Sequence, residues 1–271
     1  MAMFPSQLLL SSKHLKEQIL QPLFDPYGVE LIVNLDFDTD VYGTFCGTTP
    51  RIEGPKITVK EKCLAGMAFA NKRQGLASEG SFGPHPGSPF MSVNEEWLVY
   101  IDLDQDLEVF GHSISMEVCH QKLAYHENQL ETFLADIQFG AQGLVLKDAK
   151  NGAVIAKGIT KYTHLMNLIQ QHPIWTIETD SRAHMNPTRQ KNIALAGQDL
   201  LARMLRLCPQ CAHPDFSVRA YSGQLQCSYC QKPTQTHQFL EYQCTNCQHK
   251  IIENRKDKAV EDPQFCNRCN P

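Results

Sequence analysis

The residues most clearly arranged for chemistry are eight cysteines near the end of the chain. They form four Cys-x-x-Cys pairs: Cys208/Cys211, Cys227/Cys230, Cys244/Cys247 and Cys266/Cys269. Each pair can place two thiolates on one tight turn, and four thiolates complete a tetrahedral zinc site. The sequence therefore predicts two structural zinc ions. Four sulfur ligands leave no open position for a substrate, so these ions should support folding and not catalysis.

How the pairs share two metals depends on the segments between them. Those segments contain short apolar runs and turn residues, which is typical of a zinc ribbon, where two neighbouring cysteine turns hold one ion. We therefore expect one ion on Cys208, Cys211, Cys227 and Cys230, and the other on Cys244, Cys247, Cys266 and Cys269. An interleaved arrangement is the alternative. Disulfides are a third interpretation. We disfavour it because a disulfide within a Cys-x-x-Cys pair would close a strained ring.

Acidic side chains follow a predicted buried strand at 29–33. Asp36, Asp38 and Asp40 occupy alternate positions directly after it. Carboxylates placed in this way could offer hard oxygen ligands to magnesium, which commonly binds one or two carboxylates together with substrate phosphates. A polar surface loop with helix-capping aspartates is the alternative.

Two further segments could bind phosphate. The stretch 78–87 places Ser81 and His85 among glycines and prolines, and glycine-rich backbone can approach a phosphate closely. A plain tight turn is the alternative. Lys62 lies on the helix predicted before this stretch, where most lysines are solvated but one could contact a phosphate.

A strand-to-helix turn near residue 180 concentrates charge. Asn186 is expected to cap a helix that has Pro187 at its first position, and the turn before it is rich in charged side chains. The residues concerned are Glu178, Asp180, Arg182, His184 and Arg189. A helix N-terminus with arginines is suited to anions. An ion-paired turn with a purely structural role is the alternative.

Hydrophobic periodicity predicts the elements that position these residues. Strands are expected at 8–10, 29–33 and 174–177, hairpins at 97–111 and 144–156, and helices at 15–23, from the Thr58 capping box to Gly75, and at 116–137. This mixture predicts an α/β fold with a mixed sheet flanked by helices, followed by a small double zinc-ribbon domain. We place the domains at 1–206 and 207–271.

Charge and composition indicate which classes of partner the protein is expected to bind. Residues 1–200 carry 16 basic and 23 acidic side chains, and residues 201–271 carry nine basic and six acidic. An acidic body and a tail without a dense cationic face argue against nucleic acid. The chain lacks a long apolar run and a signal-peptide pattern, so we expect no membrane span and a cytoplasmic location. Cys46, Cys63 and Cys119 are expected to be small buried side chains and not nucleophiles.

Several longer motifs carry a resemblance to a known family. They are Asp38-Thr39-Asp40 with Gly43-Thr44-Phe45, the run from Ala77 to Pro86, Glu178-Thr179-Asp180 with Arg182-Ala183-His184, and Cys266-Asn267-Arg268-Cys269. Through these motifs the chain resembles, over essentially its full length, an uncharacterised bacterial family of α/β domains followed by cysteine-pair ribbons. The resemblance implies the architecture and conveys little about activity.

A more distant resemblance is to the inosine/xanthosine triphosphate pyrophosphatases. Ser11-Ser12-Lys13 with Lys16 is similar to the first phosphate-binding turn of that family, and Lys62-Cys63 before Ala77-Ser78-Glu79-Gly80 is similar to its second motif. The resemblance implies that magnesium would rest on Glu79, with help from the Asp36–Asp40 segment. The chain departs from the family where Asn is missing from the first turn and one acid replaces two in the second.

These observations together predict a metal-dependent phosphohydrolase that acts on a nucleotide or another phosphorylated small molecule. Glu79 with Asp38 or Asp40 would hold magnesium and orient water, and Lys16, Lys62, Arg182 and Arg189 would contact the phosphates. Ser81, His85, Asp180 and His184 complete the expected pocket. The alternative is a non-catalytic anion-binding or adaptor protein whose zinc ribbons contact a protein partner.

Overall fold

The computed structural model describes residues 4–42, 53–85, 87–118, 121–124 and 129–270. The chain forms two compact units, Met1–Leu200 and Leu201–Pro271. The division falls six residues before the expected one, inside a long helix that runs from the first unit into the second. The expected α/β class with a cysteine-rich tail is confirmed.

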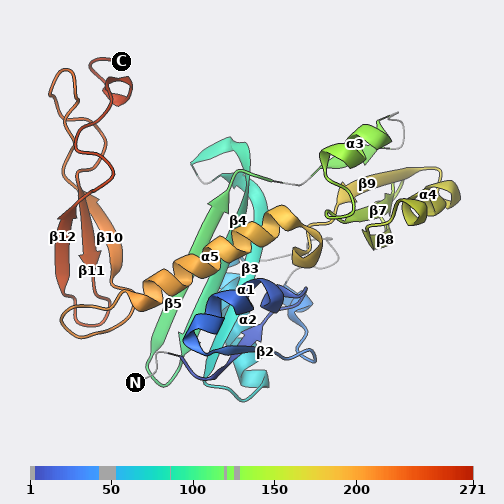
Figure 1. Cartoon of the computed structure of the whole chain (residues 1–271), viewed down its shortest axis with the longest axis horizontal. Coiled ribbons are helices and arrows are strands. Elements are labelled where there is room, and N and C mark those ends of the chain that lie inside the picture. The colour runs from blue at the N-terminus through green and yellow to red at the C-terminus, as the bar shows by residue number, and fades with distance from the viewer. Residues whose placement is uncertain (1–3, 43–52, 86, 119–120, 125–128, 271) are drawn as a thin grey trace. The chain divides into compact units, whose positions relative to one another are not determined.

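A five-stranded mixed sheet forms the centre of the first unit (Figure 1), in the order β2-β1-β3-β4-β5. Its strands are β1 (Gln7–Ser11), β2 (Glu30–Val33), β3 (Gln74–His85), β4 (Ser88–Asp102) and β5 (Leu107–Ser115). β1 pairs in parallel with β2 and β3, whereas β3, β4 and β5 form an antiparallel meander. The parallel strands are short and apolar because helices cover both faces of the sheet there.

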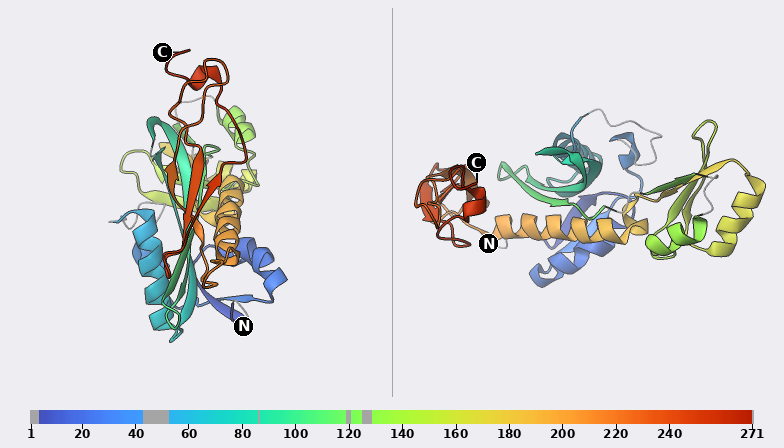
Figure 2. Two further views of the ribbon diagram at one scale, coloured as in Figure 1. Left: turned by 90° about the vertical axis from the view of Figure 1, so that its left-hand side faces the viewer. Right: turned by 90° about the horizontal axis from the view of Figure 1, so that it is seen from above.

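Helices pack on both faces of this sheet, as Figure 2 shows from the side. They are α1 (Lys16–Phe24), α2 (Pro55–Phe69) and α5 (Pro187–Leu205), with the short 3-10 helices η1 (Asp25–Tyr27), η2 (Thr39–Tyr42) and η3 (Ala183–Met185) between elements. On one face, Cys63 and Met67 of α2 pack against Ala77 and Val99. Burial raises the pKa of the Cys63 thiol to about 12, which fits a small core side chain; Cys46 and Cys119 lie outside the described residues.

Helix α2 begins three residues earlier than the predicted capping box. Gly54 is its N-cap and Pro55 its first residue, because proline is pre-organised for this position and needs no backbone donor there. The Thr58 hydroxyl donates instead to the carbonyl of Gly54, at 3.1 Å. The prediction of a capping box at Thr58 and Glu61 is therefore wrong.

The glycine-rich stretch 78–87, predicted as a loop, lies mostly in β3. This strand pairs with β4 along its whole length, from Gln74 opposite Asp102 to Pro84 opposite Ser92. Cross-strand pairing outweighs the weak strand propensity of glycine and proline here. Gly80 is required by close packing, since a Cβ at this position would collide with the side chains of Glu96 and Arg189.

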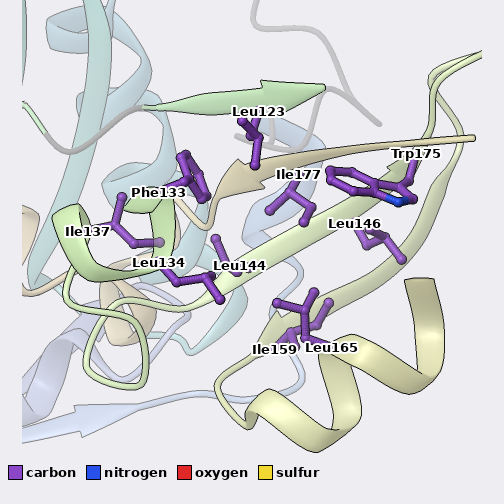
Figure 3. Packing of buried hydrophobic residues seen from close by; sticks show 10 residues of the cluster. All are labelled: Leu123, Phe133, Leu134, Ile137, Leu144, Leu146, Ile159, Leu165, Trp175 and Ile177. Carbon is purple, nitrogen blue, oxygen red and sulfur yellow. The ribbon is translucent and has the colours of Figure 1, made fainter. Parts of the chain in front are cut away.

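A second, smaller sheet has the order β6-β9-β7-β8 and antiparallel pairing throughout. Its elements are β6 (Lys122–Ala124), β7 (Leu144–Asp148), β8 (Val154–Ile159) and β9 (Trp175–Thr179), with α3 (Leu130–Asp136) and α4 (Tyr162–Gln171). Figure 3 shows the core between them, which includes Phe133, Leu165, Trp175 and Ile177, with Leu165 beside Ile159. The single helix predicted over 116–137 is wrong: this segment holds β6 and α3, because Leu123 pairs opposite Ile177 at the sheet edge.

The second unit contains a three-stranded antiparallel sheet in the order β10-β11-β12. Its elements are β10 (Ser217–Ser222), β11 (Phe239–Gln243), β12 (Lys250–Asn254) and the 3-10 helix η4 (Pro263–Phe265). A small core of Phe216, Tyr242, Cys208 and Cys244 joins the sheet to the first and third cysteine turns. Across the described part of the chain, no helix is both long and apolar enough to cross a membrane.

Replacement of Gly80 by alanine should lower the free energy of unfolding by roughly 1–3 kcal/mol, because the added methyl group must push apart a fully buried ion pair. Gly83→Ala in the same strand is the control, since a Cβ there meets nothing within 4 Å. Urea denaturation of both variants measures the difference. Equal effects of the two substitutions would contradict the packing described for Gly80.

Candidate functional site

The eight paired cysteines form two interleaved tetrads. One consists of Cys208, Cys211, Cys244 and Cys247, the other of Cys227, Cys230, Cys266 and Cys269, and in each tetrad the sulfur atoms lie within 4.8 Å of one another. Sulfur–sulfur distances between turns are 3.6–3.9 Å, close to the roughly 3.8 Å edge of a tetrahedron with zinc–sulfur bonds of about 2.3 Å. The tetrads could hold metal ions, and their all-sulfur donor sets fit structural zinc.

The expected pairing of neighbouring turns is therefore wrong, and the strand directions explain why. Ser217 at the start of β10 lies opposite Gln243 at the end of β11. This register brings the first cysteine turn, before β10, next to the third, after β11. β10 and β12 both end beside Phe239, so the second and fourth turns meet at the other end of the sheet.

A second cluster lies where β1 ends beside the longer β3. Ser11, the last residue of β1, pairs with Ala77, and among the described residues no strand pairs with β3 beyond this point on that side. The Ser78 carbonyl, just past this point, accepts hydrogen bonds from two lysines. Lys16 Nζ of α1 donates to it at 3.2 Å and also to Ser78 Oγ at 3.0 Å, and Lys62 Nζ of α2 donates to it at 2.5 Å.

The two lysines approach from opposite faces of the sheet. Lys62 also bonds Glu79, with 2.5 Å between Nζ and Oε2. Glu79 lies on the α2 face because side chains alternate along a strand, while the Ser78 side chain points to the face covered by α1 and α5. Lys16, Lys62 and Glu79 are all at least 93% buried.

A third buried cation lies on the α5 face. Arg189 Nε donates to Glu96 Oε1 at 2.6 Å, and its Nη1 donates to the Ser181 carbonyl at 2.7 Å. Asn94 Nδ2 also donates to Glu96 Oε1, at 3.0 Å. Arg189 is held in place from the start of α5, where its own backbone N–H is capped by the side chain of Asn186. The predicted N-cap of this helix is thus confirmed.

The turn before α5 adds a further ion pair and His184, which contacts a second histidine in the β1–α1 turn. Asp180 accepts hydrogen bonds from the Arg182 guanidinium, at 2.6 Å for Nη2, and from the backbone N–H of Gly158. His184 stacks on His14, with ring centroids 5.4 Å apart. His14 belongs to the β1–α1 turn, where it and Leu15 both have positive φ. Non-glycine residues in this conformation cost free energy and are often found at functional sites.

Charges in this cluster do not balance among its buried and half-buried groups. Lys62, Arg189 and Arg182 each bond a carboxylate, namely Glu79, Glu96 and Asp180. Lys16 bonds only the two neutral oxygen atoms of Ser78, and it forms no ion pair within the described residues. A buried ammonium group without a counter-charge is costly. When Lys16 is protonated, the cluster therefore has one buried positive charge in excess.

Burial, together with the nearby positive charges, lowers several pKa values in this cluster. Burial, followed by repulsion from Arg189, lowers the pKa of Lys16 from 10.5 to about 7. Burial and the charge of Lys16 lower the pKa of His14 to about 3. Burial and the charge of Arg182 lower the pKa of His184. Both histidines are therefore neutral at pH 7, and Lys16 is the group whose charge changes near that pH.

The structure brings together most of the predicted phosphate-binding residues and separates the predicted metal ligands. Lys16, Lys62, Glu79, Asp180, Arg182, His184 and Arg189 belong to the cluster just described. Asp38 instead bonds Lys13 at 2.5 Å on the surface, and the side chain of Asp40 lies outside the described residues. Ser81 lies two residues beyond Glu79 in β3, and His85 ends that strand, where its Nδ1 accepts a hydrogen bond from Gly87.

Sequence reasoning missed Glu96, His14 and the bridging carbonyl of Ser78. Asn94 and Glu96 occupy alternate positions in β4, so they share a face, and both are buried. Polar residues at this spacing could have indicated a buried partner. A backbone carbonyl gives no such signal in a sequence.

Double cysteine variants should distinguish the interleaved tetrads from neighbouring pairs. Cys208→Ser with Cys244→Ser removes ligands from one tetrad, so the protein should retain about one zinc per chain. Cys208→Ser with Cys227→Ser damages both tetrads and should lose both ions. Elemental analysis of the purified proteins measures the ratio. The reverse result would restore the neighbour pairing.

The buried charge of Lys16 should make stability depend on pH. Between about pH 7 and 10.5 the unfolded chain binds the Lys16 proton and the folded chain does not, so stability should rise with pH in that window. Lys16→Met should raise stability at pH 6 and remove this rise. Urea unfolding at pH 6 to 10 tests it, with exposed Lys60→Met as the control. An unchanged pH profile in Lys16→Met would contradict the buried charge.

Comparisons with known proteins locate the chain in a family without an assigned activity. No curated protein and no solved structure matches it, and nothing supports the resemblance to the pyrophosphatases. Residues 62–271 match the family model described as "Domain of unknown function (DUF6671)". This span includes Lys62, Glu79, Arg189 and all eight paired cysteines. The expected resemblance to an uncharacterised family with a cysteine-rich tail is thus confirmed, and the chain belongs to the DUF6671 family.

Proposed function

We propose that the cluster around Lys16 binds the phosphate groups of a small molecule such as a nucleotide. The observation that carries this proposal is the buried ammonium group of Lys16, which has no carboxylate partner among the described residues. A phosphate oxygen would supply the missing negative charge. Lys62 and Arg189 lie close enough to influence the same group, since both contribute to the lowered pKa of Lys16.

Two features of the surroundings support the proposal. The Ser11 hydroxyl, at the carboxyl end of β1, is buried and has no hydrogen-bond partner in the described structure. It could donate to a bound anion. The location also fits, because ligands of α/β sheets commonly bind beyond the carboxyl ends of parallel strands.

Hydrolysis of the bound ligand is a second proposal, favoured by the buried carboxylate of Glu79 beside the lysines. Magnesium would rest on Glu79 and on Asp38 or Asp40, with the ligand's phosphates completing its coordination. Apart from the cysteines, the described residues contain no cluster of three metal-ligating side chains. Glu79 and Asp38 would each have to release a lysine before binding a metal.

The adaptor alternative places the function of the second unit in contacts with a protein partner. Its cysteine tetrads would then hold a small, rigid surface, and the phosphate ligand of the first unit would be sensed and not converted. The formal charge of this unit is only +3 before the thiolates are counted, and each four-thiolate zinc centre adds about two negative charges. We therefore do not propose nucleic acid as a partner.

Binding and turnover can be measured on one set of proteins. Calorimetric titration with pyrophosphate and with nucleoside mono-, di- and triphosphates at pH 6.5 should show saturable binding. Lys62→Met should weaken it at least tenfold, because a buried positive charge is lost. Lys60→Met is the matched control, since Lys60 lies on the same helix but is exposed. No binding by any of these ligands would contradict the proposal.

Phosphate release from the same panel, with and without magnesium, tests the second proposal. Glu79→Gln should abolish magnesium-dependent turnover and keep the fold, which circular dichroism can verify. Binding without turnover in the unchanged protein would favour the sensing alternative. Turnover that survives in Glu79→Gln would exclude the assigned role of Glu79.

A further inference from the structure

A polar cleft of about 380 Å³ lies in the first unit, away from the side chains of the Lys16 cluster. Its wall combines the segment after β5, the end of α3 and the residues that follow it, and the first turn of α5. The lining residues that matter here are Glu117, Asp136, Gln142, Thr188 and Lys191. Its volume lies within the range of sites for small molecules.

Gln142 leaves a buried acceptor at this cleft. It is only 1% exposed, and its Nε2 donates to the carbonyls of Gly143 at 2.8 Å and Asp180 at 3.0 Å. These two acceptors fix the orientation of the amide, since a reversed amide would set oxygen against oxygen. Oε1 has no hydrogen-bond donor anywhere in the described structure. A buried acceptor without a donor is unfavourable, and a hydrogen-bond donor on a ligand would remove this cost.

Three charged side chains at the same cleft also lack partners. Glu117, Asp136 and Lys191 form no ion pair and no side-chain hydrogen bond within the part of the chain that the structure describes. Lys191 lies one turn into α5, beside Thr188, where the first backbone N–H groups of a helix carry partial positive charge. The lining of the cleft thus combines acceptors with a cationic side chain and the N-terminal turn of a helix.

We propose that this cleft binds a small zwitterion with an ammonium group and a carboxylate, that is, a ligand of the amino-acid class. The ammonium group matches the carboxylates of Glu117 and Asp136 and the free acceptor of Gln142. The carboxylate matches Lys191 and the first turn of α5 at Thr188. A polyanion such as a nucleotide fits less well, because the lining contains two carboxylates and one lysine, and the carboxylates would repel it. The site is therefore distinct from the proposed phosphate site.

The test uses the full-length protein and the twenty standard amino acids as probes. Thermal unfolding should identify at least one amino acid that raises the midpoint, and calorimetry should then give saturable binding. Asp136→Asn and Lys191→Ala should each weaken this binding at least tenfold, and both side chains are exposed, so folding should be preserved. Lys150→Ala, at an exposed hairpin turn, is the matched control and should bind as the unchanged protein does.

Two analogues of the best probe separate its two charged ends. The amine that lacks the carboxylate and the acid that lacks the amine should each bind at least tenfold more weakly than the amino acid. Gln142→Leu should also weaken binding; if this variant fails to fold, the exposed variants carry the test. Absence of binding by all twenty probes, or binding that Asp136→Asn and Lys191→Ala leave unchanged, overturns the proposal. Equal binding of either analogue also overturns it.

Discussion

The first unit is built around a buried ammonium group at an open strand edge. β1 stops at Ser11 while β3 continues, and the Ser78 carbonyl just beyond this point accepts hydrogen bonds from Lys16 and Lys62. The two lysines that donate to this carbonyl come from helices on opposite faces of the sheet. The arrangement solves one problem, an unpaired backbone acceptor, and creates another, because Lys16 gains no negative partner.

Much of the surrounding structure can be understood as a response to these charges. Glu79 neutralises Lys62, Glu96 neutralises Arg189, and Gly80 leaves the space that the second pair occupies. Lys16 has no such partner among the described residues, and burial together with the charge of Lys16 lowers the pKa of the nearby His14 to about 3. A protein selected only for stability could place methionine at position 16. Retention of a costly charge is what one expects of a site that binds an anion.

The sequence predicted which residues lie near one another better than it predicted their exact partners. The Cys-x-x-Cys spacing identified all eight cysteines of the two tetrads. Which pairs combine into one tetrad depends on which strand ends lie together, and the antiparallel register determines that. Lys16, Lys62 and Arg189 were expected to contact phosphate, and they do lie in one cluster. Asp38 or Asp40 was expected to share a magnesium ion with Glu79, yet Asp38 forms an ion pair with Lys13 on the surface. Local composition also misled at 78–87, where pairing with β4 extends a strand through glycines and prolines.

The most direct test of an anion site at Lys16 is the number of protons taken up on binding. At pH 8.5 the free protein should hold Lys16 largely neutral, because its pKa is lowered to about 7, and a bound anion should restore the charged form. Calorimetric titration of pyrophosphate in buffers of different ionisation enthalpy measures this uptake. We predict additional uptake of close to one proton per site relative to Lys16→Met. Tight binding with the same proton uptake in both proteins would contradict the account.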